Sequence, residues 1–121
     1  MDEIEIQSYL DDNGYPRHVV DAGSAGLVQR FQDFVSEVEA GYGYGLHDYR
    51  TDLDIRGLIA MFGLNHEVAA ADELLNAVLI HREHRVWESG SGDPYWDFGY
   101  PRNAGRWLVR ELQAAGLTQE S

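Results

Sequence analysis

Histidine and carboxylate residues in the second half of the chain have a spacing that could bind a metal. His81 and His84 are three residues apart and Glu88 follows four residues later, so a helix would bring two imidazoles and a carboxylate toward one ion. The sequence after His66-Glu67 lacks the second histidine of a zinc-protease motif. Histidines that pair with nearby acids are the simpler interpretation. We therefore expect no metal, no cofactor and no catalytic residue, and keep a small His/carboxylate metal-dependent enzyme as an alternative.

Acidic residues gather in the N-terminal half. Residues 1–54 hold twelve Asp or Glu and three Arg, a net charge of −9, whereas residues 55–121 carry −3. Asp48, Asp52 and Asp54 begin a predicted helix, and Glu37 and Glu39 close the helix before it. Acids at a helix N-terminus can simply stabilise the helix through its dipole. The functional interpretation is a surface that docks against Arg and Lys of a basic partner.

The segment from Trp87 to Pro101 mixes aromatic and acidic residues without a helical or strand period. Aromatic side chains in such a loop usually cover the core. Interleaved with acids, they are also typical of a protein-binding hot spot whose partner supplies arginine. We therefore place Trp96, Asp97 and Tyr100 in a candidate partner-binding surface together with Asp48, Asp52 and Asp54.

Composition narrows the possible functions. The 121 residues include no Cys and no Lys and carry a net charge of −12, which excludes thiolate chemistry, Schiff-base chemistry and the lysine of a phosphate-binding loop. So negative a protein disfavours nucleic acid and anionic lipid as partners. Asp2, Glu3 and Glu5 are unlike a signal peptide, and the longest apolar run, residues 57–64, is too short to span a membrane. We expect a cytoplasmic protein with one domain, residues 1–121.

Apolar spacing predicts four main helices. They run from Ser24 to about Gly41, from Asp48 or Thr51 to Phe62, from an N-cap at Asn65 onward, and from about Asn103 to an end at Gly116-Leu117. Within the second helix, Asp52 and Arg56 are spaced to form an i, i+4 ion pair. The predicted core faces are Leu27, Val28, Phe31, Phe34, Val35 and Val38; Leu53, Leu58, Ile59 and Phe62; Val68, Ala71, Leu74, Leu75 and Val78; and Trp107, Leu108, Leu112 and Ala115.

Residues 3–20 fit two structures. Alternating polar and apolar residues before the turn signal at residues 11–14 favour a small β-hairpin. A short helix broken at Asn13-Gly14 is the alternative, because Ile4, Tyr9 and Leu10 can share one helical face. The predicted fold class is therefore mainly α, a compact bundle of about four helices, with a small N-terminal β-hairpin under the first interpretation.

Three stretches of sequence resemble a known type of protein. They are Gly26-Leu27-Val28-Gln29-Arg30-Phe31 with Asp33-Phe34-Val35, then Asp48-Tyr49-x-x-Asp52-Leu53-Asp54-x-Arg56, then Tyr95-Trp96-x-Phe98-x-Tyr100-Pro101. Together they are similar to small acidic bacterial proteins that look like the immunity proteins of contact-dependent and polymorphic toxin systems. The resemblance implies a cytoplasmic protein that binds and blocks one cognate toxin domain, a basic protein and often a nuclease. A phage-type acidic inhibitor that mimics nucleic acid is an alternative, and its mark would be rows of carboxylates on one face.

Overall fold

Helices form most of the computed structural model, which describes residues 2–80, 100–101 and 104–115. In chain order they are α1 (Glu3–Asp12), α2 (Arg17–Gly41), α3 (Leu46–Met61), the 3-10 helix η1 (Asn65–Val68), α4 (Ala69–Val78) and α5 (Arg106–Ala114). Two short strands, β1 (Leu79–Ile80) and β2 (Tyr100–Pro101), pair antiparallel. The predicted mainly α class is confirmed. No helix in the described ranges is long and apolar enough to cross a membrane.

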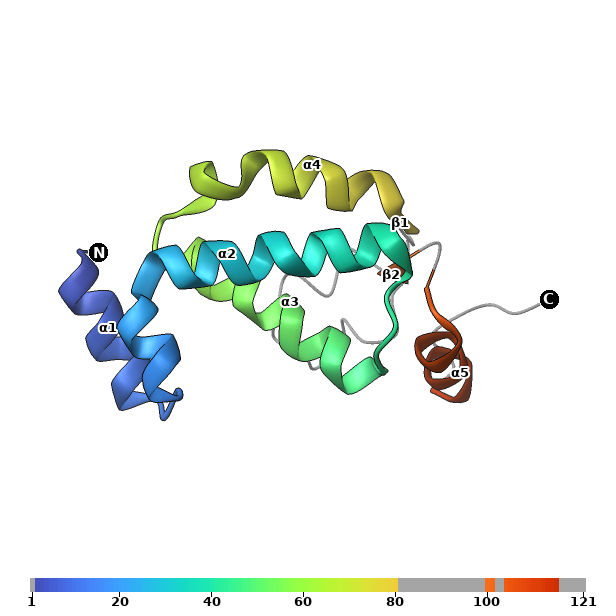
Figure 1. Ribbon diagram of the computed structural model, residues 1–121, viewed down its shortest axis with the longest axis horizontal. Helices are drawn as coiled ribbons and strands as arrows, with labels where there is room; N and C mark the ends of the chain where they lie inside the picture. Colours follow the sequence, from blue (N-terminus) through green and yellow to red (C-terminus); the bar gives the residue numbers. More distant parts are fainter. Residues whose placement is uncertain (1, 81–99, 102–103, 116–121) are drawn as a thin grey trace.

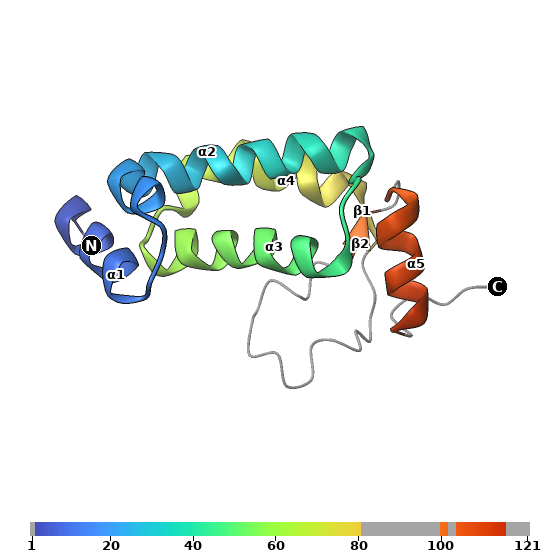
Figure 2. The ribbon, with the colours of Figure 1, turned by 60° about the horizontal axis from the view of Figure 1, so that its bottom comes forward.

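α2 is the central helix. It contacts α1, α3, η1 and α4, whereas α5 packs against α3. Figures 1 and 2 show α1 at one end of the long axis, α3 and α4 lying along α2, and α5 at the opposite end. The predicted apolar face of α2 forms the middle of the core: Leu27, Phe31, Phe34, Val35 and Val38 are buried and Val28 is partly buried.

The N-terminal segment is helical, so the predicted hairpin is wrong and the helical alternative is confirmed. Asp2 caps α1: its carboxylate accepts from Glu5 N at 2.9 Å, and the Glu5 carboxylate accepts from Asp2 N. Ile6 and Leu10, one turn apart, are buried in the core, while Ile4 is 77% exposed. The cap and the i, i+4 apolar pair therefore outweigh the alternation of polar and apolar residues.

α2 begins at Arg17 rather than at Ser24, and it bends at Gly23. Gly23 has φ +59° and ψ −142°, a backbone conformation that residues with a Cβ avoid. Side chains of α1 satisfy backbone groups on both sides of the bend. Glu3 accepts from Ser24 N at 3.0 Å and from Ser24 Oγ at 2.6 Å, and Gln7 Nε2 donates to two carbonyl oxygens of the preceding turn at 3.1 and 3.3 Å.

The predicted core face of α3 is confirmed, but the start of the next helix differs from the prediction. Leu53, Leu58, Ile59 and Phe62 are buried, and Gly63, with φ +75°, follows the end of the helix. Asn65 is not an N-cap: it is the first residue of η1, and its side-chain oxygen accepts a hydrogen bond from Arg56 instead. The Asn65 side-chain oxygen that was expected to cap the helix is therefore used by the Arg56 guanidinium.

Arg56 is the one buried charged side chain of the described residues, 5% exposed. Its Nε and Nη2 donate to the two carboxylate oxygens of Asp72 at 2.9 and 2.8 Å, and its Nη1 donates to Asn65 Oδ1 at 2.7 Å. The guanidinium carbon lies 5.7 Å from the centre of the Phe31 ring. The predicted pair with Asp52 is not formed, because Asp72 offers both oxygens to the planar fork of donors.

On α4 and α5, fewer apolar side chains are buried than predicted. α5 begins at Arg106, three residues later than expected, and buries Leu108 and Leu112. Trp107, 53% exposed, and Ala115 were predicted to face inward and do not. A residue next to a buried one is turned by about 100° on a helix, and the same geometry leaves Leu74 48% exposed while Val68, Ala71 and Leu75 are buried and Val78 is partly buried. The predicted ending at Gly116-Leu117 lies outside the described residues.

Removal of the carboxylate that pairs with Arg56 should destabilise the protein strongly. Asp72→Ala leaves a buried guanidinium without its bidentate partner, so we expect the free energy of unfolding to fall by about 3 kcal/mol. Arg17→Ala is the control, since it removes exposed pairs with Asp11 and Asp21, and should cost less than about 1 kcal/mol. Urea unfolding measures both variants, and equal losses would contradict the prediction.

The bend in α2 should tolerate no side chain at its centre. A Cβ on Gly23 would lie 3.0 Å from Glu3 Cδ and would occupy a strained backbone conformation, so Gly23→Ala should lower the free energy of unfolding by roughly 2 kcal/mol or more. Gly43→Ala is the control, because a Cβ there meets nothing within 4 Å. A thermal melt that leaves the Gly23 variant as stable as the Gly43 variant would refute this account of the bend.

Candidate functional site

An acidic hollow lies between α2 and α3. Asp33 and Glu37 are one turn apart on α2, and Asp48 and Asp52 are one turn apart on α3. Because the two helices pack together, these i, i+4 pairs place carboxylates on both sides of one concavity. The hollow encloses about 350 Å³, and its lining consists of Arg30, Asp33, Phe34, Glu37, Asp52 and Ile55.

Tyr42 supports one carboxylate of the acidic hollow. Its hydroxyl donates to Asp52 Oδ2 at 2.6 Å. The ring is fully buried, 5.7 Å from the ring of Phe34 and 5.6 Å from that of Tyr49. Gly41, with φ +101°, ends α2 immediately before it. Burial and the hydrogen bond to Asp52 raise the pKa of the Tyr42 phenol far above its ordinary value, so Tyr42 remains a donor at neutral pH.

Two carboxyl groups of the hollow, Asp52 and Glu37, have raised pKa values. Burial raises the pKa of Asp52, and the charge of Asp48 raises it further, while the Tyr42 hydrogen bond and the charge of Arg30 act in the opposite direction. Burial also raises the pKa of Glu37, followed by repulsion from Asp52 and Asp33. The hollow therefore holds crowded negative charge, and a cation that entered it would relieve the repulsion.

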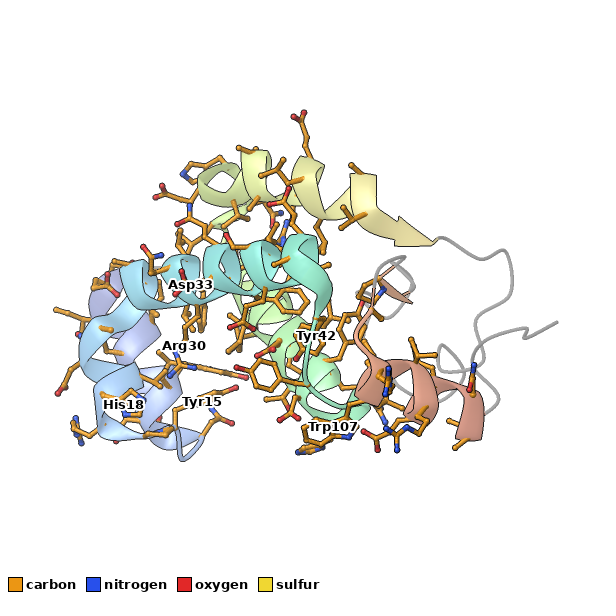
Figure 3. All side chains as sticks on the ribbon, turned by 45° about the vertical axis from the view of Figure 1, so that its right-hand side comes forward. Tyr15, His18, Arg30, Asp33, Tyr42 and Trp107 are labelled. Carbon is orange, nitrogen blue, oxygen red and sulfur yellow. The ribbon has the colours of Figure 1, made fainter. Side chains whose placement is uncertain are left out.

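Arg30 lines the hollow without neutralising it by a direct ion pair. Its Nη2 lies 3.2 Å from His18 Nε2, and no salt bridge within the described part of the chain involves Arg30. Figure 3 shows Arg30 beside His18 and Tyr15, with Tyr42 further along toward α5. The Arg30 guanidinium therefore contacts the imidazole of His18.

The structure brings together part of the predicted partner-binding surface. Asp48 is exposed and Asp52 is half-buried, both on the side of α3 that faces Tyr42. Asp54 is exposed but does not line the hollow, because two residues beyond Asp52 correspond to about 200° around the helix. Trp96 and Asp97 lie outside the described residues. The backbone of Tyr100 pairs with Ile80 at the β1–β2 ladder.

Sequence reasoning found only part of the wall of the hollow that α2 supplies. Glu37 was grouped with the acids of α3 as a possible docking surface, whereas Asp33 was quoted only within the stretch Asp33-Phe34-Val35 and was not placed in that surface. The available signal was the repeated i, i+4 spacing of carboxylates, at residues 33 and 37 and again at residues 48 and 52. Nothing in either pair alone indicates that the two would face each other.

Metal chemistry gains no support from the described residues, in which no group of three or more His, Asp or Glu could hold an ion. His66 is exposed, and its Nε2 lies 4.0 Å from the neighbouring Glu67 carboxylate. His81, His84 and Glu88 fall outside the described ranges, so the expectation of no metal stays a prediction and the metal-dependent enzyme stays its alternative.

Neutralising Glu37 should stabilise the protein at neutral pH. A carboxyl whose pKa is raised on folding binds protons more readily in the folded state, so its ionised form opposes folding above the folded pKa. That cost is relieved as the pH falls through the raised pKa toward the ordinary value of 4.5. We therefore expect Glu37→Gln to raise the midpoint of urea unfolding at neutral pH, by a small amount for an exposed group, and to lose this advantage on acidification.

The matched control for this titration is Glu73→Gln on α4, an exposed glutamate away from the hollow. A gain in stability at Glu73 equal to that at Glu37 would mean that overall net charge, rather than crowding in the hollow, is responsible. NMR titration of the Glu37 carboxyl carbon gives the pKa directly, and a value at or below the ordinary one would overturn the explanation.

No family model, no curated protein and no solved structure matches this chain. The chemistry of the hollow follows from the side chains that line it. Its lining has three acidic side chains and an apolar contribution from Phe34 and Ile55, and the phenol of Tyr42 donates to one of the acids, Asp52. These groups suit the binding of a cationic side chain with an apolar stem.

Proposed function

We propose that this protein is an immunity-type protein that acts in the cytoplasm, where it binds one basic toxin domain and neutralises it. The observation that carries the proposal is the acidic hollow, in which carboxylates from α2 and α3 surround a concavity large enough for side chains of a partner. The raised pKa values of Glu37 and Asp52 mean that binding a cation is favoured by relief of repulsion as well as by direct attraction.

Charge and apolar surface together favour a basic protein as the partner. The net charge of −12 steers cationic proteins toward the surface and speeds their association. Phe34 and Ile55 offer apolar contact for the methylene stem of a lysine or arginine, while Asp33, Glu37 and Asp52 face its charged head. Asp48 and Asp52 belong to this proposed interface. The roles of Asp54, Trp96, Asp97 and Tyr100 in it stay predictions.

A second candidate is an acidic inhibitor that mimics nucleic acid. The observation that favours it is the presence of two short rows of carboxylates, on α2 and on α3, on one side of the molecule. Within each row the two residues are about 6 Å apart along the helix axis. The lining of the hollow takes two acids from the α2 row and only one from the α3 row, and it also includes the cation Arg30. The basic toxin domain is therefore the better-supported partner.

The test compares two variants that change net charge equally. Asp33→Asn with Glu37→Gln neutralises the hollow, and Asp12→Asn with Glu73→Gln neutralises two exposed acids elsewhere. With each tagged protein as bait in lysate of the source cells, we expect the hollow variant to retain roughly tenfold less of the one-to-one partner at low salt. The difference should shrink at high salt, because screening weakens exposed charges, and the control variant should behave like the unchanged protein.

Co-expression separates neutralisation from mere binding. The captured partner should arrest growth when expressed alone, the unchanged protein should restore growth, and the hollow variant should restore it less. A partner that is harmless alone would rule out the toxin reading. A partner that duplex DNA displaces from the protein would instead support the nucleic-acid mimic.

A further inference from the structure

Two aromatic side chains are exposed where α5 meets the α2–α3 connection. Trp107 is 53% exposed and Tyr44 is 48% exposed. The indole of Trp107 lies against the Gly45 backbone, so closely that a Cβ on Gly45 would fall 2.7 Å from Trp107 Nε1. We call Tyr44, Gly45 and Trp107 the aromatic corner; Figure 3 shows Trp107 at the outer side of α5, beside the start of α3.

Two hydrogen bonds from backbone N–H groups hold the aromatic corner in place. Gly105 N, at the start of α5, donates to Tyr42 O at 2.8 Å, and Leu46 N, at the start of α3, donates to Glu111 Oε1 at 3.0 Å. The first bond ties the start of α5 to the residue that follows α2, and the second ties the start of α3 to the second half of α5. The rings are therefore presented on a fixed frame, which reduces the conformational entropy that a partner must remove on binding.

The aromatic corner adjoins the acidic hollow. The Tyr44 ring packs edge-to-face on Tyr42, with ring centres 5.5 Å apart, and Tyr42 also donates to Asp52. Asp48 accepts from Gly45 N at 3.3 Å. Acidic groups thus border the corner on the α3 side, whereas Arg106 and Arg110 flank Trp107 on α5.

We propose that the aromatic corner binds an arginine of the basic partner, whose guanidinium stacks on Trp107 or Tyr44 while Asp48 lies at its edge. This inference rests on the proposed function and names the side chain that the surface selects. Arginine fits better than lysine because the guanidinium is planar and weakly hydrated and can stack on a ring. An ammonium ion would gain from the carboxylates but less from the aromatic faces, and Arg106 and Arg110 would oppose either cation alike.

Two peptides of equal charge test the selectivity, hexa-arginine and hexa-lysine, each titrated calorimetrically into the purified protein at neutral pH. We expect the arginine peptide to bind more tightly, by roughly two- to fivefold for each stacked ring. Trp107→Ala and Tyr44→Ala should each reduce this preference, and Trp107→Phe should keep part of it. Met61→Ala removes an equally exposed apolar side chain from the far end of α3 and should leave the preference unchanged.

The outcomes separate the inference from the proposed function. Equal affinity for the two peptides, no binding of either, or a preference that survives in both aromatic variants would overturn the inference. The Asp33→Asn/Glu37→Gln variant should weaken both peptides alike, because it removes charge and no ring. If the lysate partner is lost with the hollow variant but retained with Trp107→Ala, the proposed function stands and the aromatic corner has no part in it.

Discussion

A buried guanidinium sets how the central helices lie against one another. Arg56 belongs to α3, its hydrogen-bond partners Asn65 and Asp72 belong to η1 and α4, and its charge lies over Phe31 of α2. A charge removed from water is tolerated only where its partners are in place. The rotation of α3 about its own axis is therefore restricted, and with it the direction of Ile55, the next residue back, and of Asp52, one turn earlier. The acidic hollow depends on this restriction.

The hollow itself works against the stability of the fold. Glu37 and Asp52 keep their carboxyl groups in surroundings that oppose ionisation, although a glutamine or a leucine would remove the repulsion. Arrangements that lower stability without a structural benefit are typical of functional surfaces. Tyr42 contributes both to the stability of the fold and to the hollow, because its ring packs in the core and its hydroxyl donates to Asp52.

The sequence was sufficient to predict features that depend on the residues of one helix alone. The apolar period of α2 and α3 predicted their buried faces, from Leu27 to Val38 and from Leu53 to Phe62, because a stripe along a helix must find a core. It failed where partners lie far apart in the chain. Arg56 was paired with Asp52 on spacing, whereas its partner is Asp72. Asn65 was expected to cap a helix, and Asp33 was not connected to Asp48 and Asp52. Each choice depends on helix packing that local spacing does not contain.

The hydrogen bonds between helices differ in the number of residues that separate their two partners along the chain. The contacts of Glu3 with Ser24 span 21 residues, and the Arg56–Asp72 pair spans 16, whereas Leu46 and Glu111 are 65 residues apart. Closing a longer loop costs more entropy and takes longer. The α1–α2 and α3–α4 units can therefore assemble early from local contacts, and α5 is expected to dock last. The aromatic corner is then complete only in the finished molecule: before α5 docks, Tyr44 and Asp48 lie beside each other without the indole of Trp107.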